Sequence, residues 1–302
     1  MVRSQINTAG FSHLYPFSPH FVSLRGMNYH YVDEGNGEPL LMLHGNPTWS
    51  FYYRRLIAAF SPSHRAIVPD HLGCGLSDKP TSRQYDFRLE SRVEDVEFLV
   101  DQLDIKEKIT LVLHDWGGMI GLAYAVKYPD RIGRIILTNT AGFFPPGKKK
   151  IPLRLRMIRN LAWLATPAVL GFNLFSFSAL WMAPKKRLPK LVRNGLTAPY
   201  HRPRHRLATL KFVQDIPLFP GDPGYAIVEN VSKKLNLFAA VPVLILWGMH
   251  DFVFDPDYLA EWKRHWPHAQ IHAFDDAGHY LLEDVPEKVI PLIRDFLKRH
   301  PL

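Results

Sequence analysis

Short apolar runs alternate with longer amphipathic stretches along most of the chain. Runs of this length, rich in β-branched residues and leucine, predict strands, and the stretches between them have helical periodicity. The expected strands are Phe21–Leu24, Tyr29–Val32, Leu40–Leu43, Ala66–Val68, Ile109–Leu113, Ile135–Thr138, Val243–Leu246 and Gln270–Phe274. The expected helices lie near Phe51–Phe60, Leu89–Leu103, Met119–Lys127, Pro256–His265 and Pro286–Lys298. This alternation indicates an α/β fold with a mostly parallel eight-stranded sheet.

The alternation of expected strands and helices stops at Gly142, shortly after the sixth expected strand, and resumes at Val241. Between residues 142 and 225, helical apolar segments and prolines take its place. An insertion into the sheet is the simplest account of this change. We therefore predict a core formed by residues 1–141 and 226–302 and a helical cap formed by residues 142–225.

One part of the predicted cap, Asn160–Pro184, contains no charged residue over 25 positions. That is long enough to span a bilayer. The run is broken by Pro167 and Gly171, however, and it lies between two halves of one sheet, so a membrane span would split the fold. We interpret it as short helices that cover a pocket, with an interfacial or oligomer-forming surface as the alternative.

The chain of 302 residues has a formal net charge of +9, and the cap supplies the whole excess. Residues 142–220 contain fifteen lysines and arginines and a single acid, Asp215. A basic patch indicates an anionic partner, but this one is broken by prolines and matches no nucleic-acid-binding module, so no nucleic acid partner is expected. A peripheral membrane contact through the cap, and a homo-oligomer, remain open.

The cysteine content and the N-terminal segment indicate the cellular compartment in which the protein is expected. Cys74 is the one cysteine, so no internal disulfide can form, as is usual in a reducing compartment. Met1–Pro16 has no apolar run of the kind found in a signal peptide. We expect a cytoplasmic protein, with membrane association left open.

The segment Ile109–Gly118 runs from an apolar strand through a sharp polar turn into a helix. This is the setting of a nucleophile elbow, which presents one side chain at the carboxyl end of a central strand. Asp115 holds that position, where Ser is usual, and Leu113 replaces the first Gly of the usual motif. A carboxylate is ionised at pH 7 and can attack carbon directly to leave an ester. The alternative is an Asp that merely caps the helix.

A histidine and a second acid follow two later strands. His279 comes after Gln270–Phe274 and before the last helix, where a fold of this type places a histidine facing the elbow. Asp251 follows Val243–Leu246 and is the candidate that would fix the imidazole tautomer. The segment Asn139–Phe143, after the sixth strand, offers no competing acid. The chain order of nucleophile, acid and histidine is that of the α/β-hydrolases.

Two further residues could bind an anion beside Asp115. Asn46 lies in the loop after Leu40–Leu43, which in such folds supplies a backbone amide to the oxyanion hole, and its side chain adds an NH₂ donor. Trp116 follows the nucleophile and adds an indole N–H. Neutral donors can hold a departing anion without trapping it. Alternatively, Trp116 is a core aromatic residue and Asn46 a turn residue.

Several stretches together resemble the haloalkane dehalogenases, across about Phe21–Leu297. They are HGNPTWSFYYR, PDHLGCGLSDKP, LHDWGGMIGLAYA, WGMHDFVFD and DAGHYLLED. The set Asp115, His279, Asp251, Asn46 and Trp116 looks like the subfamily usually called subfamily III, which also contains the β-lactone decarboxylases of long-chain olefin biosynthesis. The stretch FVQDIPLFPGDPGYA, within Phe212–Ala226, is similar to both groups. The resemblance implies an α/β-hydrolase fold with the cap inserted after the sixth strand.

The resemblance also implies a mechanism for haloalkanes. Asp115 displaces halide from an sp³ carbon while Asn46 and Trp116 stabilise the halide ion. His279, supported by Asp251, then activates water to hydrolyse the alkyl-enzyme ester, and the backbone amides of Asn46 and Trp116 form the oxyanion hole. The partners are a small apolar substrate and halide, and no metal or organic cofactor is needed. We expect this dehalogenase activity, with cis-β-lactone decarboxylation as the alternative.

Two other functions are weighed against these. Epoxide hydrolases also use an Asp nucleophile but need paired cap tyrosines, and Tyr200 is the one tyrosine between Gly142 and Pro220. A non-catalytic binding protein on the same fold is expected to have a broken triad, whereas all five reactive positions are intact here. Both functions therefore rank below the first two.

Overall fold

The computed structural model describes residues 6–302, so the first five residues of the predicted N-terminal segment lie outside it. Its sheet confirms the eight expected strands, most of them longer by one to four residues than the apolar run that predicted them. The strands are β1 (His20–Leu24), β2 (Met27–Glu34), β3 (Pro39–Leu43), β4 (Arg65–Pro69), β5 (Ile109–Asp115), β6 (Ile132–Thr140), β7 (Val243–Gly248) and β8 (Gln270–Phe274). Their order is β1-β2-β4-β3-β5-β6-β7-β8.

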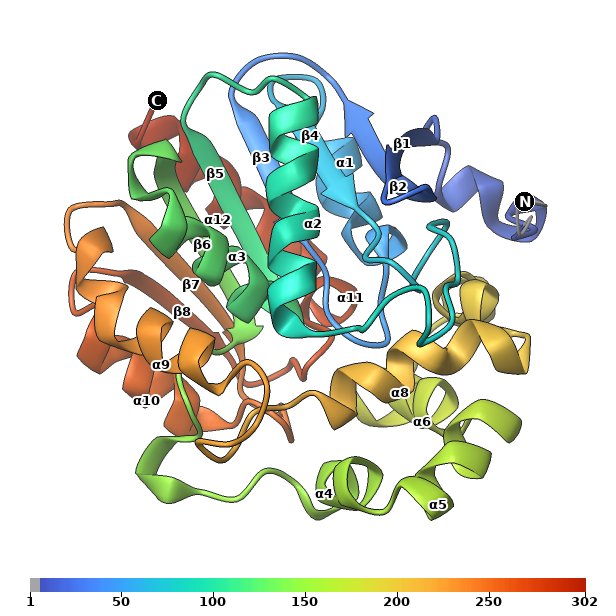
Figure 1. Ribbon diagram of the computed structural model, residues 1–302. Helices are drawn as coiled ribbons and strands as arrows, with labels where there is room; N and C mark the ends of the chain where they lie inside the picture. Colours follow the sequence, from blue (N-terminus) through green and yellow to red (C-terminus); the bar gives the residue numbers. More distant parts are fainter. Residues whose placement is uncertain (1–5) are drawn as a thin grey trace.

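Only β2 runs against its neighbours; the strands from β4 to β8 are parallel. Helices cover both faces of the sheet, and β3 and β5 are consequently buried at every residue. This explains why they read as continuous apolar runs in the sequence. The carboxyl ends of the parallel strands meet at one edge, beneath which the cap lies in Figure 1.

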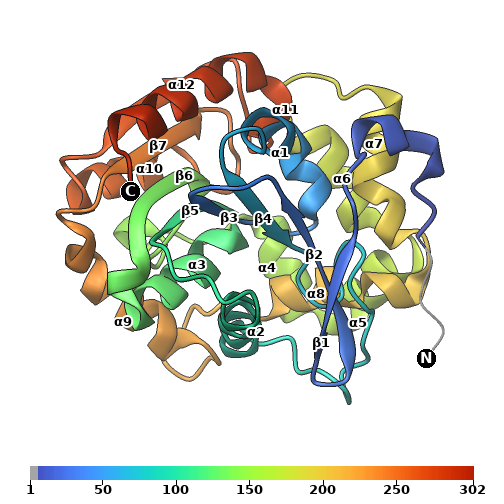
Figure 2. The ribbon, with the colours of Figure 1, turned by 90° about the horizontal axis from the view of Figure 1, so that it is seen from above.

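The core helices divide between two apolar layers, one on each face of the sheet. The helices are α1 (Arg54–Phe60), α2 (Leu89–Gln102), α3 (Trp116–Lys127), α9 (Tyr225–Lys234), α10 (Pro256–His265), α11 (Leu281–Asp284) and α12 (Pro286–Arg299). Residues of α2, α3, α9 and α10 pack in one layer, and those of α1 and α12 in the other. Figure 2 shows α2 and α3 on one side of the strands and α1 and α12 on the other. The predicted helix Phe51–Phe60 begins as a 3₁₀ turn, Ser50–Tyr53, before α1.

The cap consists of short helices between β6 and α9. They are α4 (Leu153–Asn160), α5 (Ala162–Thr166), the π-helical turn Pro167–Gly171, α6 (Leu174–Met182), α7 (Lys190–Thr197) and α8 (Leu207–Gln214). Buried Arg206, just before α8, joins the π-helical turn to the segment after α7, because its guanidinium donates to the carbonyls of Leu170, Gly171, Tyr200 and His201. A buried cation is thus satisfied without a carboxylate.

The uncharged run of the cap is divided into separate helices. Within the described residues, no single helix is long and apolar enough to cross a membrane. The helical segments Ala162–Gly171 and Leu174–Met182 together have the necessary length and composition, but they meet at an angle of 77°.

Asp70 joins the loops that approach the carboxyl edge of the sheet. Its buried carboxylate accepts the N–H groups of Ser50 and Leu76, both at 2.7 Å, and lies 2.8 Å from His30 Nδ1. Burial alone would raise its pKa, but His30, His44 and these hydrogen bonds outweigh burial and lower the pKa well below its ordinary value. Because Ser50 ends the loop that begins at His44, this carboxylate also fixes the path of Asn46.

We expect Asp70→Asn to lower the free energy of unfolding by about 3 kcal/mol, because one of the backbone donors loses a charged acceptor in a buried site. A carboxyl whose pKa is depressed in the folded state contributes stability above its unfolded pKa and loses it as the pH falls. The difference between wild type and variant should therefore shrink below about pH 4. Urea unfolding at several pH values measures it. A difference that grows toward low pH would contradict this assignment.

Candidate active site

Asp115 lies at a strained turn where β5 ends and α3 begins. Its backbone has φ 51° and ψ −126°, a conformation that non-glycine residues rarely adopt. The turn is possible because Gly117 brings the start of α3 against the backbone of Leu43, where a Cβ would not fit. Gly45 is equally constrained, because a Cβ there would overlap the Asp115 carboxylate. The sequence therefore builds a nucleophile elbow without its usual first glycine.

The Asp115 carboxylate is buried and bound by backbone amides from two loops. Asn46 N–H donates to Oδ1 at 2.8 Å, and Trp116 N–H also donates to the carboxylate. Burial raises the pKa of Asp115 above its ordinary value, although His279 and these two amides act in the opposite direction. No hydrogen bond to the second or third helical amide is formed, so a capping role does not explain this residue.

His279 and Asp251 meet this carboxylate from the ends of two other strands. The Nδ1 of His279 lies 2.7 Å from Asp251 Oδ2, and its Nε2 lies 3.6 Å from Asp115 Oδ2. The other oxygen of Asp251 accepts the N–H groups of Val253 at 2.7 Å and Phe254 at 3.1 Å. The three side chains that sequence reasoning proposed as a triad are thus brought together, in the geometry of an imidazole held by one carboxylate and facing another.

The imidazole of His279 is enclosed by aromatic rings. Phe254 stacks on it with centroids 5.9 Å apart, and His114 lies 4.7 Å away. Burial lowers the pKa of His279, but the carboxylates of Asp251 and Asp115 outweigh it and raise the pKa above its ordinary value. Burial and the adjacent His279 both lower the pKa of His114, which is therefore neutral.

Neither of the other acids near His279 in the sequence competes with Asp251. Asp276 is paired with Lys288 at 2.7 Å on the surface. Glu283 is bound to Arg54 at 2.5 and 2.8 Å through both of its oxygens. The structure thus leaves one carboxylate in contact with Nδ1.

Asn46 and Trp116 flank Asp115, as the sequence predicts. The Nδ2 of Asn46 donates to the Thr209 carbonyl on α8 at 3.0 Å, which leaves its second hydrogen available. The indole of Trp116 packs edge-on against Phe212, also on α8, at 5.3 Å. No acceptor for its Nε1 lies within hydrogen-bond distance among residues 6–302, so this donor is free for a substrate. The cap therefore orients both proposed anion donors.

These groups lie at the floor of an apolar cavity of about 410 Å³ between the core and the cap. Asn46, Asp115, Trp116 and His279 line it, whereas Asp251 lies behind His279. Most of the remaining wall is aliphatic or aromatic, including Phe143, Ile158, Val169, Phe175, Val213, Ile216, Leu218 and Phe254. Within the described residues, no group of three or more His, Cys, Asp or Glu side chains is arranged to hold a metal ion.

Two functional positions after β6 were missed because they are not acids. Asn139 exchanges two hydrogen bonds with Gly248, at 3.0 and 2.8 Å, and so fixes the start of the loop that carries Asp251. Thr140 Oγ1 donates to the Asp115 carbonyl at 2.5 Å and supports the elbow. The one feature of the sequence that could have indicated these two residues is that their polar side chains lie at the end of a strand.

Asp284 was also missed, although it stands in one of the stretches that carry the family resemblance. Its buried carboxylate accepts the N–H groups of Gly278, Lys185 and Lys186, each at 2.8 Å. Gly278 precedes the catalytic candidate His279, and the two lysines follow the last turn of α6. This carboxylate therefore ties the histidine loop to the cap, through partners that lie almost a hundred residues apart in sequence.

We expect Asp251→Asn to lower the pKa of His279, because one of the two carboxylates that stabilise the imidazolium is lost. NMR titration of the assigned His279 resonance measures this pKa. Asp276→Asn is the matched control, since Asp276 lies three residues from His279 but pairs with Lys288. If the pKa of His279 fell in Asp276→Asn and stayed unchanged in Asp251→Asn, then Asp276 and not Asp251 would be the carboxylate partner of His279.

Comparison with known proteins identifies the family of this chain. The family model described as the α/β hydrolase fold matches residues 38–286. A cis-3-alkyl-4-alkyloxetan-2-one decarboxylase of Shewanella oneidensis is 50% identical over 94% of this chain and 89% of its own length. The protein of the same name from Xanthomonas campestris pv. campestris is 43% identical over 95% of this chain and 98% of its own length.

Haloalkane dehalogenases are more distant relatives. One from Mycolicibacterium paratuberculosis is 31% identical over 89% of each chain. The crystal structure of a haloalkane dehalogenase from Agrobacterium tumefaciens C58 superposes with a TM-score of 0.82 at 25% identity, over 95% of this chain and 99% of that one. The chain therefore belongs to the α/β-hydrolase fold family, within the group that contains the haloalkane dehalogenases and the cis-3-alkyl-4-alkyloxetan-2-one decarboxylases.

Proposed function

We propose that this protein converts cis-3-alkyl-4-alkyloxetan-2-ones, which are β-lactones, into an alkene and CO₂. The observation that carries the proposal is the 50% and 43% identity to two decarboxylases named for this substrate, against 31% to a dehalogenase. Dehalogenation, the leading expectation from the sequence, thus becomes the second candidate. The residues proposed for catalysis are the same in both.

Asp115 is the proposed nucleophile toward the lactone. Asn46 N–H holds its Oδ1, and Oδ2 is directed toward His279 and remains available. Attack of Oδ2 on the ring carbon C4 forms a C–O bond to Asp115 and breaks the bond between C4 and the ring oxygen. The negative charge moves from Asp115 to the new carboxylate of the substrate, so no proton is required.

Asn46 and Trp116 are suited to stabilise that carboxylate. Both provide neutral N–H donors beside Asp115, and the indole N–H of Trp116 has no acceptor among the described residues. Preorganised donors of this kind lower the barrier most where charge develops. In this reaction they would bind a substrate carboxylate at the place where a dehalogenase binds halide.

The second step returns the charge to Asp115. The substrate carboxylate loses CO₂, the electron pair of the broken C–C bond forms the double bond between C3 and C4, and the bond from C4 to Asp115 breaks. Inversion at C4 in the first step, followed by anti elimination in the second, yields a cis alkene from a cis lactone. Atoms and charge balance without water.

His279 has a different importance in the two candidate reactions. In dehalogenation it must remove a proton from water to hydrolyse the alkyl ester, with the amides of Asn46 and Trp116 as the oxyanion hole. In decarboxylation it holds positive charge beside Asp115 and removes no proton. The apolar wall of the cavity supports the second reaction, because it suits alkyl chains and disfavours water, which would hydrolyse the ester.

The other functions are less well supported. Tyr200, the one tyrosine of the cap up to Pro220, donates to the Thr48 carbonyl at 3.1 Å and does not line the cavity. Tyr225, at the end of the cap, stacks on Phe144 and does not line the cavity either, so the cap offers no tyrosine pair for epoxide opening. The contacts among Asp115, His279 and Asp251 argue against a non-catalytic binding protein.

The direct test offers purified protein a long-chain cis-3,4-dialkyl β-lactone and, separately, 1-bromo- and 1-iodoalkanes. Alkene, CO₂, β-hydroxy acid, alcohol and halide are all measured. We expect cis alkene and CO₂ from the lactone, with a kcat/KM higher than for any haloalkane, and a loss of about 10⁴-fold or more in Asp115→Asn. Halide release from a haloalkane, with no alkene formed from the lactone, would contradict the proposal and favour dehalogenation.

His279→Phe separates the two mechanisms within one protein. With a bromoalkane we expect about one equivalent of bromide, no alcohol and an alkyl mass on Asp115, because ester hydrolysis needs the base. With the lactone we expect repeated turnover to alkene. Intact-protein mass spectrometry and product counting measure both. If the lactone reaction also stops after one equivalent, His279 acts as a base there and the proposed proton-free route is wrong.

A further inference from the structure

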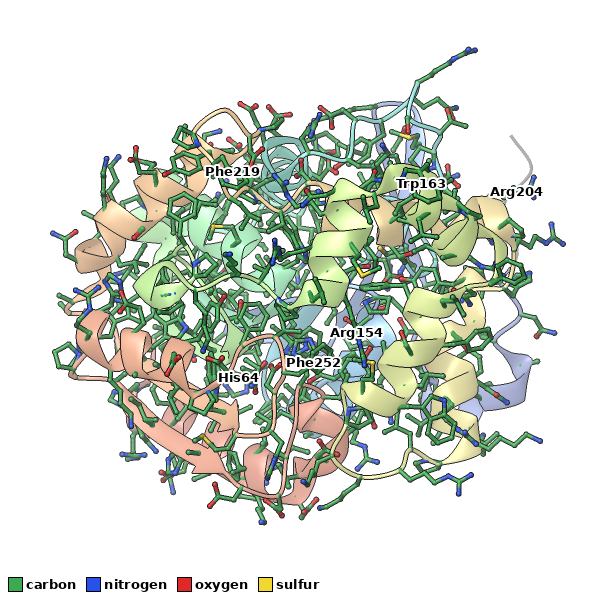
Figure 3. All side chains as sticks on the ribbon, turned by 90° about the horizontal axis from the view of Figure 1, so that it is seen from below. His64, Arg154, Trp163, Arg204, Phe219 and Phe252 are labelled. Carbon is green, nitrogen blue, oxygen red and sulfur yellow. The ribbon has the colours of Figure 1, made fainter. Side chains whose placement is uncertain are left out.

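Large apolar side chains are unusually exposed on the cap. Eleven of them lie between residues 142 and 225: Leu153, Met157, Leu161, Trp163, Leu164, Phe172, Leu174, Phe177, Trp181, Leu191 and Phe219. Trp163 is 77% exposed and Phe172 is 73% exposed. Exposed apolar surface of this extent marks a contact site. Arg154, Trp163, Phe219 and Phe252 can be located on this face in Figure 3.

The same surface carries positive charge that no acid neutralises. In the described part of the chain, ten exposed or half-exposed cations of the cap have no carboxylate within ion-pair distance: Lys150, Arg154, Arg156, Lys185, Arg187, Lys190, Arg193, Arg202, Arg204 and Lys211. The single acid between residues 142 and 220, Asp215, is buried and bound to Arg88 and Arg92. The cap is therefore apolar and cationic at once.

Trp181 shows how the two properties combine. The residue is 56% exposed, and the guanidinium groups of Arg187 and Arg193 lie 5.6 and 4.9 Å from the centroid of its ring. An exposed indole flanked by arginines suits the boundary between lipid chains and headgroups, where the ring is half desolvated and the guanidinium groups reach anionic oxygens.

The apolar face surrounds the opening of the cavity. Met157, Leu164, Leu174 and Phe252 are exposed and also line the cavity. Arg154 lies at the same place and donates to Met182 Sδ at 2.7 Å, which joins α4 to the end of α6. A layer that covered this face would lie directly over the entrance.

We propose that the cap docks on an anionic phospholipid bilayer, with its aromatic residues in the interface and its cations on the lipid headgroups. Charge complementarity selects this occupant over a second copy of the chain, because a self-contact would bring two cationic rims together. The angle of 77° within the uncharged run suits helices that lie in the interface. If the proposed function also holds, apolar substrates enter the cavity from the acyl chains without crossing water.

Sedimentation with sucrose-loaded vesicles tests the docking without any substrate. The purified protein is mixed with phosphatidylglycerol–phosphatidylcholine vesicles and with pure phosphatidylcholine vesicles. We expect binding to the anionic vesicles that weakens as salt rises from about 0.05 to 0.5 M, since the Debye length falls. Absence of binding at low salt would overturn the proposal.

Variants locate the contact on the cap. Trp163→Ser and Phe172→Ser, neither of which lines the cavity, should each weaken binding about tenfold or more. Lys150→Gln and Lys190→Gln should each weaken it about fivefold. The matched controls are Leu237→Ser, exposed at the amino edge of the sheet before β7, and Lys298→Gln near the end of α12. The controls should bind as wild type does.

Equal losses in the controls would show that the net charge of +9 acts without a defined face, and would overturn the proposal. A particle mass in buffer that falls in Trp163→Ser and Phe172→Ser, with no vesicle binding by wild type, would show that a second copy covers the face. That result would also overturn it. Thermal unfolding of each variant checks that lost binding does not reflect lost folding.

Discussion

A negative charge buried at the end of a central strand is the constraint on which the rest of this structure depends. The Asp115 carboxylate is removed from water, and burial acts to keep it protonated. It can serve as a nucleophile only if the surrounding groups restore the ionised form. Two backbone amides and the His279 imidazole act against burial and favour the ionised form, and each comes from a different loop at the carboxyl edge of the sheet. The strained backbone at Asp115 and the glycines around it allow these loops to approach one another closely.

The cap contributes to the same arrangement from the opposite side. Its helix α8 accepts a hydrogen bond from Asn46 and packs against Trp116, so the two proposed anion donors are oriented by an element that also lines the cavity. Asp284 links the end of α6 to the loop of His279. Changes in the cap would therefore affect the chemistry as well as access to the cavity, and substrate preference and catalytic geometry are coupled in this fold.

Much of this could be predicted from the sequence, because the strands are short apolar runs that end in polar residues. Parallel strands bring those ends to one edge, so Asp115, Asp251, His279 and Asn46 could be expected to meet. Asp284 could not be assigned, because its partners on the cap lie far away in the sequence and no periodic pattern connects them. The helices of the cap do not alternate with strands. Contacts within the cap include hydrogen bonds from Arg206 to the carbonyls of Tyr200 and Leu170, which no sequence pattern indicates. The substrate was also beyond prediction, since the same residues are the proposed site for a halide and for a carboxylate leaving group.

The central claim is that charge moves from Asp115 to the substrate and back while no proton is transferred. The deuterium content of the alkene formed from a cis-β-lactone in D₂O tests it most directly. If Asp115 attacks C4 and the ester then fragments, C3 and C4 keep their own hydrogens, and gas chromatography with mass spectrometry will find a cis alkene without deuterium. One deuterium at the former C3 would show that the C3 proton is removed and replaced during the reaction, and would contradict a route without proton transfer.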